Sequence, residues 1–202
     1  MSIAPFSPTT FDSLVLPPEP VKRWTVAEYH ELIRLGLLDE EDPYELIEGW
    51  LVTKMTKNPP HDSLVNFLSQ FFIRILPPDW SCRAQSAVTL ADGEPEPDIA
   101  IVRGSPLDYR GQHPGPAQIG LVIEVADSSY ARDRGIKLRS YARAGIAEYW
   151  IVNLQQPQIE VYSVPKPETS EYTMRKDYAP GQSVPVVLAG QPFGEIAVGP
   201  LF

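Results

Sequence analysis

The sequence lacks the features that mark several large classes of protein. Cys82 is its only cysteine, so no disulfide framework supports the fold, as is usual in a reducing cytoplasm. No apolar run approaches the roughly 20 residues that a membrane-spanning helix needs. The first 20 residues have neither the basic start nor the apolar centre of a secretory signal. We therefore expect a cytoplasmic protein with no membrane partner.

Positive charge is scarce as well. The chain has 17 Lys and Arg residues against 26 Asp and Glu residues, which gives a net charge of -9. Such a protein attracts nucleic acid weakly in general, because phosphate binding depends mainly on Lys and Arg. If nucleic acid is the partner, its contacts must be local and partly mediated by metal.

The composition is otherwise that of a globular protein, with 43% hydrophobic and 21% charged residues among 202. Proline is concentrated near the N-terminus, so we read residues 1–22 as a flexible arm. Residues 23–202 are then expected to form a single domain with its core at about residues 44–154. The sequence contains no internal repeat.

Two helices and a strand are predicted in the N-terminal half. Thr25 and Glu28 form a capping box before the first helix, whose apolar residues recur at helical spacing. Residues 44–52 are rich in β-branched and aromatic side chains and are read as one strand. An apolar stripe at helical spacing predicts the second helix over residues 61–76.

The rest of the chain alternates strands with one further helix. The predicted middle elements are strands 81–90, 98–102 and 120–126, a helix over 130–144 and a strand over 148–154. The unit of residues 120–154 is a βαβ crossover, which is right-handed almost without exception. Shorter strands are predicted at residues 158–164, 172–177, 184–188 and 193–198, and together they form an antiparallel extension.

Two carboxylates interrupt apolar strands in this middle region. Asp98 enters one strand and Glu124 lies inside the next, where an unpaired carboxylate is costly to bury. Short connections favour antiparallel pairing of the two strands, which brings the carboxylates close enough to share one divalent cation. Mg²⁺ prefers oxygen ligands and keeps several waters, so it suits this pair, and Mn²⁺ is a possible substitute.

Several side chains are candidates to surround these two acids. Lys137 follows on the next helix and can orient or deprotonate a water there, or offset phosphate charge. Asp133 and Tyr141 share its helix face, so a surface pair of Lys137 with Asp133 is the alternative. His61, at a helix start, is either a phosphate ligand or an exposed first-turn residue.

Purely structural roles also remain open for the other candidate residues. Asp98 can be a simple turn residue at a strand entrance, and Glu124 can form a structural ion pair with Arg132 or Arg139. Glu45 and Glu48 alternate along the predicted strand, so at most one of them joins the site. Tyr141 is more easily explained by packing than by chemistry.

The ordered set of motifs resembles a known family. The residues that carry the resemblance are Tyr44-Glu45-Leu46-Ile47-Glu48-Gly49, His61, Pro97-Asp98-Ile99-Ala100-Ile101-Val102, Leu121-Val122-Ile123-Glu124-Val125, Lys137, Tyr141 and Glu148-Tyr149-Trp150-Ile151-Val152. Over about residues 24–165 the chain is similar to the Uma-two family, whose members are described as "putative restriction endonucleases", within the PD-(D/E)XK nuclease superfamily.

The resemblance implies a fold and a chemistry. The fold is α/β (α+β), with a restriction-endonuclease-like αβββαβ core, a mixed sheet flanked by helices, an N-terminal helix and strand, and a C-terminal antiparallel extension. It implies that Asp98 and Glu124 hold the metal, that Lys137 is the active-site lysine and that Glu45 assists. The chain departs from the superfamily pattern at Ala126, where the motif lysine would stand.

We therefore predict a Mg²⁺-dependent endonuclease that hydrolyses DNA, with catalytic Asp98, Glu124, Lys137 and Glu45 and with His61 and Tyr141 binding substrate. The alternative is a degenerate nuclease fold that binds nucleic acid or a protein without cleavage, which the acidic composition and Ala126 favour. A two-carboxylate glycosidase accounts for neither the lysine nor the order of elements. A homodimer is expected, because two-fold pairs are the commonest oligomers.

Overall fold

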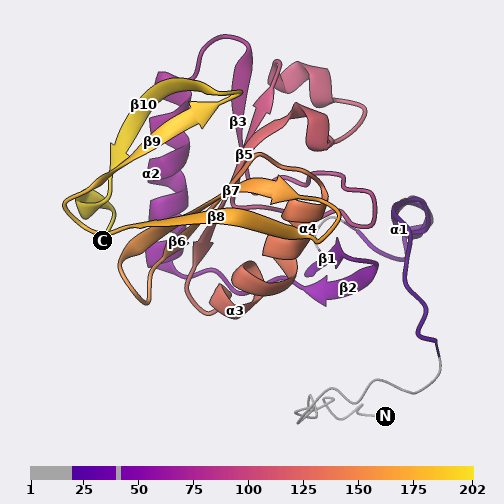
Figure 1. Ribbon diagram of the computed structural model, residues 1–202. Coiled ribbons are helices and arrows are strands. Elements are labelled where there is room, and N and C mark those ends of the chain that lie inside the picture. Colours follow the sequence, from indigo (N-terminus) through magenta and orange to yellow (C-terminus); the bar gives the residue numbers. More distant parts are fainter. Residues whose placement is uncertain (1–19, 40–41) are drawn as a thin grey trace.

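The computed structural model describes residues 20–39 and 42–202. Most of the predicted flexible arm, residues 1–19, lies outside the described residues. The chain begins with α1 (Val26–Arg34), whose N-terminus carries the predicted capping box of Thr25 and Glu28. Figure 1 shows α1 at the edge of the molecule, and none of its residues is fully buried.

A six-stranded mixed sheet organises the rest of the molecule. Its strand order is β3-β4-β5-β6-β7-β8. Only β5 and β6 run parallel, and the chain between them forms the predicted crossover. The strands are β3 (Trp80–Ala84), β4 (Ile99–Arg103), β5 (Ile119–Ala126), β6 (Glu148–Asn153), β7 (Gln158–Lys166) and β8 (Glu171–Tyr178). The predicted mixed sheet flanked by helices is confirmed.

One face of the sheet packs against α2 (Pro59–Ile75) and a C-terminal hairpin, β9 (Ser183–Leu188) with β10 (Gln191–Ala197) (Figure 1). Odd-numbered residues of β4 and β5, such as Ile99, Ile101 and Ile123, point to this side. The apolar stripe of α2 is thus core, as its spacing predicts.

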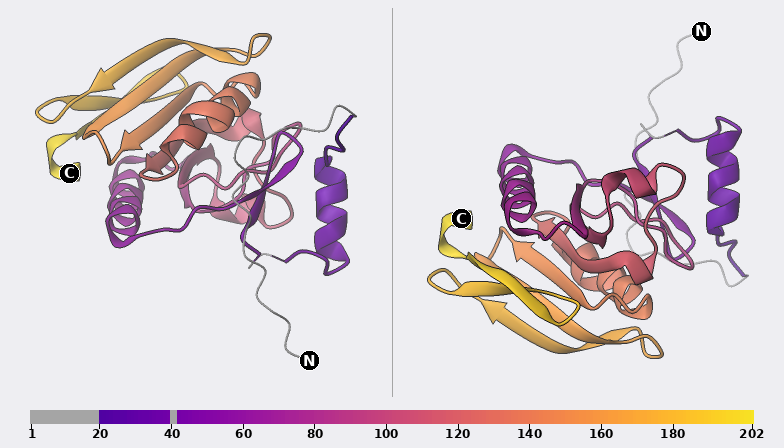
Figure 2. Two further views of the ribbon diagram at one scale, coloured as in Figure 1. Left: turned by 90° about the horizontal axis from the view of Figure 1, so that it is seen from below. Right: turned by 90° about the horizontal axis from the view of Figure 1, so that it is seen from above.

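The opposite face is covered by the crossover helix, as the two views of Figure 2 show. The crossover consists of α3 (Tyr130–Arg132), the π-helical segment η3 (Asp133–Lys137) and α4 (Leu138–Arg143). Even-numbered residues of β4 and β5 face it. Because both faces are covered, every residue of β5 is buried, Glu124 included.

The strand predicted over residues 44–52 is instead a hairpin of β1 (Tyr44–Ile47) and β2 (Trp50–Thr53). Glu48 and Gly49 form the two-residue turn, with φ of 50° and 79°. Such turns need positive φ at both positions to match the twist of the strands. The hairpin lies beside the loop that leads to β4, where the Glu94 amide donates to the Leu46 carbonyl.

Two further predicted elements differ in detail. The strand expected over residues 81–90 ends at Ala84, because Gln85 adopts a positive φ of 48°, which is not a strand conformation. The helix expected over residues 130–144 is not a continuous α-helix. At its centre the Leu138 amide donates to the Asp133 carbonyl, which widens one turn to a π-turn.

The C-terminal extension is antiparallel, as predicted, but it has two parts. β7 and β8 extend the main sheet, whereas β9 and β10 form a two-stranded sheet of their own. The remaining short helices are η1 (Pro106–Tyr109), η2 (Pro116–Gln118) and η4 (Gly199–Leu201). None of the helices in the described part of the chain has the length and apolarity needed to cross a membrane.

Candidate active site

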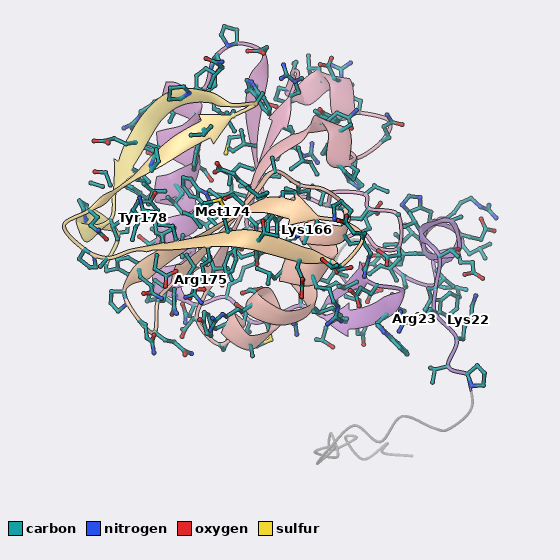
Figure 3. The ribbon with its side chains drawn as sticks, in the orientation of Figure 1. Lys22, Arg23, Lys166, Met174, Arg175 and Tyr178 are labelled. Carbon is teal, nitrogen blue, oxygen red and sulfur yellow. The ribbon has the colours of Figure 1, made fainter. Side chains whose placement is uncertain are left out.

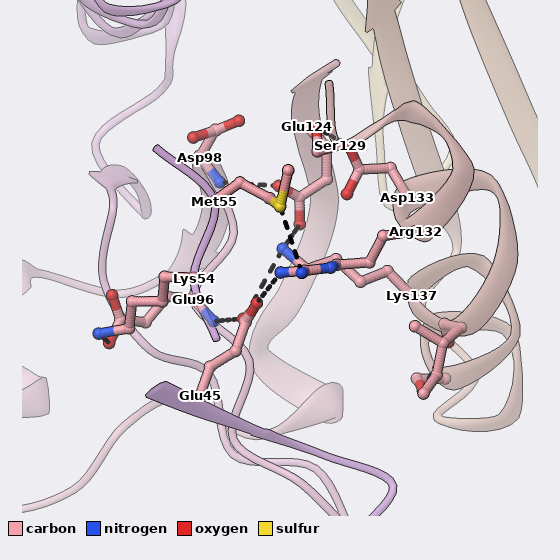
Figure 4. Close-up of polar contacts among 12 residues, drawn as sticks. Glu45, Lys54, Met55, Glu96, Asp98, Glu124, Ser129, Arg132, Asp133 and Lys137 are labelled. Carbon is pink, nitrogen blue, oxygen red and sulfur yellow. Dashed lines mark hydrogen bonds and ion pairs between the residues drawn. The ribbon is translucent and has the colours of Figure 1, made fainter. Parts of the chain in front are cut away.

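The two predicted metal ligands lie side by side on neighbouring strands. Ile99 pairs with Ile123 across β4 and β5, so Asp98 lies next to Glu124 on the same face. The Asp98 amide donates to Glu124 Oε2 at 3.3 Å, and the Val125 amide donates to Asp98 Oδ2 at 2.8 Å. Figure 4 shows the first of these bonds. Each carboxylate is therefore held by the backbone of the strand beside it.

Lys137 reaches the same place from η3. Its Nζ lies 2.9 Å from Glu124 Oε1 and 3.7 Å from Glu45 Oε2, and its side chain is only 7% exposed (Figure 4). The alternative of a solvent-exposed surface pair with Asp133 is therefore wrong. Neither Arg132 nor Arg139 forms an ion pair with Glu124.

Glu45 joins this group from β1. Its Oε2 accepts the Glu96 amide at 3.0 Å, and its Oε1 lies 3.6 Å from Arg132 Nη1. Glu48 goes elsewhere, because Arg139 and Arg143 of the crossover helix hold it. One glutamate of the two thus lies in the site, as the sequence predicts, although the reason is a turn between them and not strand alternation.

His61 and Tyr141 each contact one of the two central carboxylates. His61 Nε2 lies 3.1 Å from Asp98 Oδ2, and this bond raises the pKa of His61 against the opposing effect of burial. Its side chain is 12% exposed, so the exposed first-turn alternative does not hold. The Tyr141 hydroxyl donates to Glu124 Oε1 at 3.0 Å from a fully buried position. Tyr141 lies behind the carboxylate and does not line the pocket in front of it.

Two further residues, Asp133 and Arg132, belong to the group, although the sequence suggested them only as alternative ion-pair partners of Lys137 and Glu124. Asp133 is buried beside Lys137, and Ser129 Oγ donates to it at 2.6 Å. The sequence signal for Asp133 is its spacing of four residues from Lys137, which places both side chains on one helix face. Arg132 closes one side of the pocket by donating to the Thr53 carbonyl at 2.8 Å and to Met55 Sδ at 3.3 Å (Figure 4). No sequence pattern connects that arginine with Met55.

The cluster around Lys137 contains more acidic than basic side chains. Burial raises the pKa of Glu124 well above its ordinary value; Lys137 opposes this shift, and Asp133 and Asp98 add to it. Burial lowers the pKa of Lys137, but the charges of Glu124, Glu45 and Asp133 outweigh burial and raise it above the ordinary value. The lysine is therefore protonated, while the carboxylates around it are incompletely neutralised. An added cation would relieve this imbalance.

The pocket in front of the two carboxylates is open and polar. Its walls include Asn58, Asp127 and Ser128 as well as His61 and Lys137. Within residues 20–39 and 42–202, no group of three or more His, Cys, Asp or Glu side chains is arranged to hold a metal ion. A metal here would therefore be held by two carboxylates, with waters and substrate oxygens completing its shell. Mg²⁺ is commonly bound in this way, so the donor set fits it.

Residues 26–191 match a family model, Uma2, that is described as "Putative restriction endonuclease". The chain belongs to the Uma2 (Uma-two) family. The match spans α1, the hairpin, the whole six-stranded sheet and the crossover helix. The resemblance stated from the motifs is thus confirmed, and the chain carries a nuclease-type family assignment.

Among solved structures, the chain is similar to the crystal structure, at 1.96 Å resolution, of a "putative nuclease belonging to DUF820" from Anabaena variabilis ATCC 29413. The two share 18% sequence identity, with a TM-score of 0.66 over 85% of this chain and 96% of the other. At that identity the likeness establishes the fold alone, and the fold agrees with the PD-(D/E)XK superfamily. A comparison with curated proteins gives no match.

Ala126 occupies the position of the superfamily's motif lysine. It lies in β5 two residues after Glu124, on the same sheet face, and is fully buried. No amine is available from this strand position. The ammonium group near Glu124 comes instead from Lys137 on the crossover helix.

Proposed function

We propose that the protein is a Mg²⁺-dependent endonuclease that hydrolyses DNA phosphodiester bonds. The observation that carries the proposal is the contact of Lys137 Nζ with Glu124 at 2.9 Å, beside Asp98 and at the base of an open pocket. Two carboxylates can hold a divalent cation for phosphodiester hydrolysis, and an ammonium group can offset the charge that develops on the phosphate. The family assignment supports the same class of reaction.

Asp98 and Glu124 would hold the metal in this proposal. Bound Mg²⁺ would act as a Lewis acid toward the scissile phosphate and would lower the pKa of water. The backbone amides of Val125 and Asp98 fix the directions of the two carboxylates. Tyr141 and Lys137 both donate to Glu124 Oε1, which leaves Oε2 facing the Asp98 side.

Lys137 would orient the attacking water and offset the charge that develops on the phosphate. The surrounding carboxylates keep it protonated, so we assign it a positioning and electrostatic role and not that of a base. Glu45 would hold the ammonium from the opposite side. His61 would bind a phosphate oxygen at the pocket wall, because its imidazole is cationic more readily than usual.

The direct test is cleavage of supercoiled plasmid with Mg²⁺ or Mn²⁺ and with EDTA as a blank. We expect nicking by the wild type and a loss of more than about 100-fold in Asp98→Ala, because a metal ligand is removed. Asp79→Ala is the matched control. Asp79 is 61% exposed and contacts only Arg103 among ion-pair partners in the described chain, so its activity should be unchanged.

The alternative function, a nuclease fold that binds without cutting, has support from Ala126 and from the acidic composition. Absence of nicking by pure protein across Mg²⁺, Mn²⁺, Co²⁺ and Ca²⁺ would favour it. Metal binding separates the two further. Calorimetric titration of Mn²⁺ should show one site that Glu124→Gln removes if the endonuclease proposal holds.

We also propose a homodimer and a single domain over residues 23–202. β8 forms the outer edge of the main sheet and exposes Met174, which Figure 3 labels beside Arg175 and Tyr178. Exposed edge strands pair readily with a second chain. A monomer by light scattering would contradict the dimer, and more than one resistant fragment in limited proteolysis would contradict the single domain. A cytoplasmic location stays a prediction.

A further inference from the structure

A second groove adjoins the active-site pocket. The two share Lys54, Gln85 and Glu96 as a common wall. From there the second groove lies between α1, the segment that follows β3 and the loop after β4, and Arg83 and Tyr109 are among the residues that line it. The endonuclease proposal assigns no role to this surface.

Arg83 projects from the same face of the sheet as the two carboxylates. It pairs with Ala100 on β4, and Ala100 pairs with Val122 on β5. Asp98 and Glu124 lie two residues further along those two strands, so their side chains share this face. By strand geometry the Cα atoms of Arg83 and Asp98 are roughly 8 Å apart. That distance is roughly two nucleotides along the axis of one nucleic-acid strand.

The guanidinium of Arg83 is held in place without a counter-ion. Its Nε is buried and has no hydrogen-bond partner, and within residues 20–39 and 42–202 it forms no ion pair. The guanidinium lies 5.4 Å from the centre of the Tyr109 ring. Burial lowers the pKa of Arg83, so the positive charge is already destabilised. An anion would supply the missing acceptor and charge.

Most arginines of the described residues are paired with an acid. Seven of the arginines in the described residues form an ion pair with Asp or Glu, namely Arg34, Arg103, Arg132, Arg134, Arg139, Arg143 and Arg175. The other four, Arg23, Arg74, Arg83 and Arg110, form no ion pair within residues 20–39 and 42–202. Of these four, Arg83 and Arg110 both line the groove beside the site.

Glu94 and Glu96, two of the acids that line this groove, have other partners. Glu94 contacts His30 at 2.9 Å, and Glu96 contacts Lys54 at 2.5 Å. Gln85, at the junction of the two grooves, has a positive φ of 48°, a backbone conformation that residues other than glycine rarely adopt. Strain at such a junction is a common feature of functional surfaces.

We propose that Arg83 and Arg110 bind a backbone phosphate of the nucleic-acid strand, roughly two nucleotides from the phosphate that enters the active site. The inference deepens the endonuclease proposal and rests on it for the identity of the ligand. It resolves the difficulty raised by the net charge of -9, because the phosphate contacts are concentrated in one groove. Tyr109 positions Arg83 by stacking under its guanidinium.

The test is binding of a fluorescent oligonucleotide, single-stranded and duplex, measured by anisotropy over a range of salt with EDTA present to prevent cleavage. We expect Arg83→Gln and Arg110→Gln each to weaken binding about 3- to 30-fold. Each should also reduce the slope of log K against log salt by about 0.7 to 0.9, the value for one lost phosphate contact. Arg110 is exposed, so Arg110→Gln does not depend on refolding of a buried site.

Arg74→Gln is the matched control. Arg74 is also exposed and forms no ion pair in the described part of the chain, but it lies in α2 and lines neither the pocket nor the groove. Its affinity and salt slope should equal those of the wild type. An equal loss in Arg74→Gln, or unchanged affinity in both groove variants, would overturn the inference.

Plasmid nicking by the same proteins separates this inference from the endonuclease proposal. If the wild type nicks DNA and both groove variants bind the oligonucleotide normally, the endonuclease proposal stands and the phosphate-binding role of the groove is refuted. Wild type that binds through Arg83 and Arg110 but does not nick supports the groove and refutes the endonuclease. Wild type that binds no oligonucleotide at all refutes the groove directly.

Discussion

The β1–β2 hairpin contributes one glutamate to each of two buried charged groups, and the two groups differ in their balance of charge. Glu45 lies among Asp98, Glu124 and Asp133 around one buried lysine. Glu48, at the turn, is instead held by two arginines. The first group has an excess of acid, whereas the second has enough base for its acid.

The pKa shifts follow this difference. Hydrogen bonds from Arg139 lower the pKa of Glu48 to about 2 in spite of burial, and Arg143 adds to the effect. In the other group, burial raises the pKa of Asp133 and of Glu124. A neutralised carboxylate contributes to stability, whereas an acid whose pKa is raised by burial costs stability at neutral pH. The imbalance thus distinguishes the group to which we assign the proposed chemistry.

Glu160 provides a second example of the balanced kind. It is fully buried, yet Arg175 lies 3.2 Å away and the hydroxyls of Tyr130 and Tyr162 donate to it. Burial raises the pKa of Glu160, but these partners outweigh burial and lower it. Arg175 lies on β8 (Figure 3), where it pairs with Tyr162 on the face of the sheet that the crossover helix covers. Burial alone therefore does not identify a reactive carboxylate here.

The largest expected effect comes from Lys137→Met. Loss of the ammonium should reduce plasmid nicking by more than about 100-fold, because charge stabilisation of the reacting phosphate is lost. Arg139→Met, on the same helix but in the balanced group, should leave the cleavage rate of the folded protein within about twofold. Circular dichroism confirms that each variant is folded at the assay temperature. Equal losses in the two variants would remove the functional distinction between the groups.

The next effect is on stability and comes from Glu48→Gln. We expect the free energy of unfolding to fall by about 2 to 3 kcal/mol, because Arg139 loses its ion-pair partner and Arg143 loses one of its two. Urea denaturation measures the change. Asp92→Asn is the control, because Arg143 still pairs with Glu48 when Asp92 is replaced. This variant should lower the free energy of unfolding by less than about 1 kcal/mol. A larger loss from Asp92→Asn would contradict the central place of Glu48.

Acid pH should weaken the balanced group in a defined window. The folded pKa of Glu48 is lowered from 4.5 to about 2, so its stabilisation is complete above about 4.5 and is lost as the pH falls toward 2. Arg139 is half exposed and its charge is screened, so we expect a loss of about 2 kcal/mol. In Glu48→Gln, the free energy of unfolding should lose this part of its pH dependence. An identical pH profile in the two proteins would contradict the assignment.

The smallest expected effect is a gain in stability, in the variant Asp133→Asn. Asp133→Asn removes one acid from the group with excess acid while keeping an oxygen that accepts from Ser129. We expect the protein to become more stable at pH 7 by about 1 kcal/mol, and the melting temperature should rise. Asp127→Asn, at the pocket edge, serves as the control with no such gain. A fall in the melting temperature of Asp133→Asn would show that Asp133 is stabilising.

Much of the fold and the main pair of the site follow from local pattern. The apolar runs around Asp98 and Glu124 predict neighbouring strands, and the short connection predicts the antiparallel register that places the acids together. The helix spacing predicts that Lys137 and Tyr141 share a face, and both contact Glu124. These features depend on periodicity, which a single sequence carries.

What the sequence did not predict depends on backbone exceptions and on distant contacts. The hairpin turn at Glu48 has a residue type that is uncommon at positive φ, so only Gly49 gave a signal. The π-turn before Leu138 depends on tertiary packing, which includes a hydrogen bond from Tyr149 to the Asp133 carbonyl. The pairing of Arg132 with Met55 joins segments 77 residues apart.

The position of the amine also affects how such proteins are recognised. A search that requires a lysine two residues after the glutamate passes over this chain, because Ala126 stands there. The chemical group is nonetheless present, 13 residues further along the chain from Glu124 and within hydrogen-bonding distance of it. Surveys of this superfamily should therefore query the space around the paired carboxylates for any ammonium, whichever segment carries it.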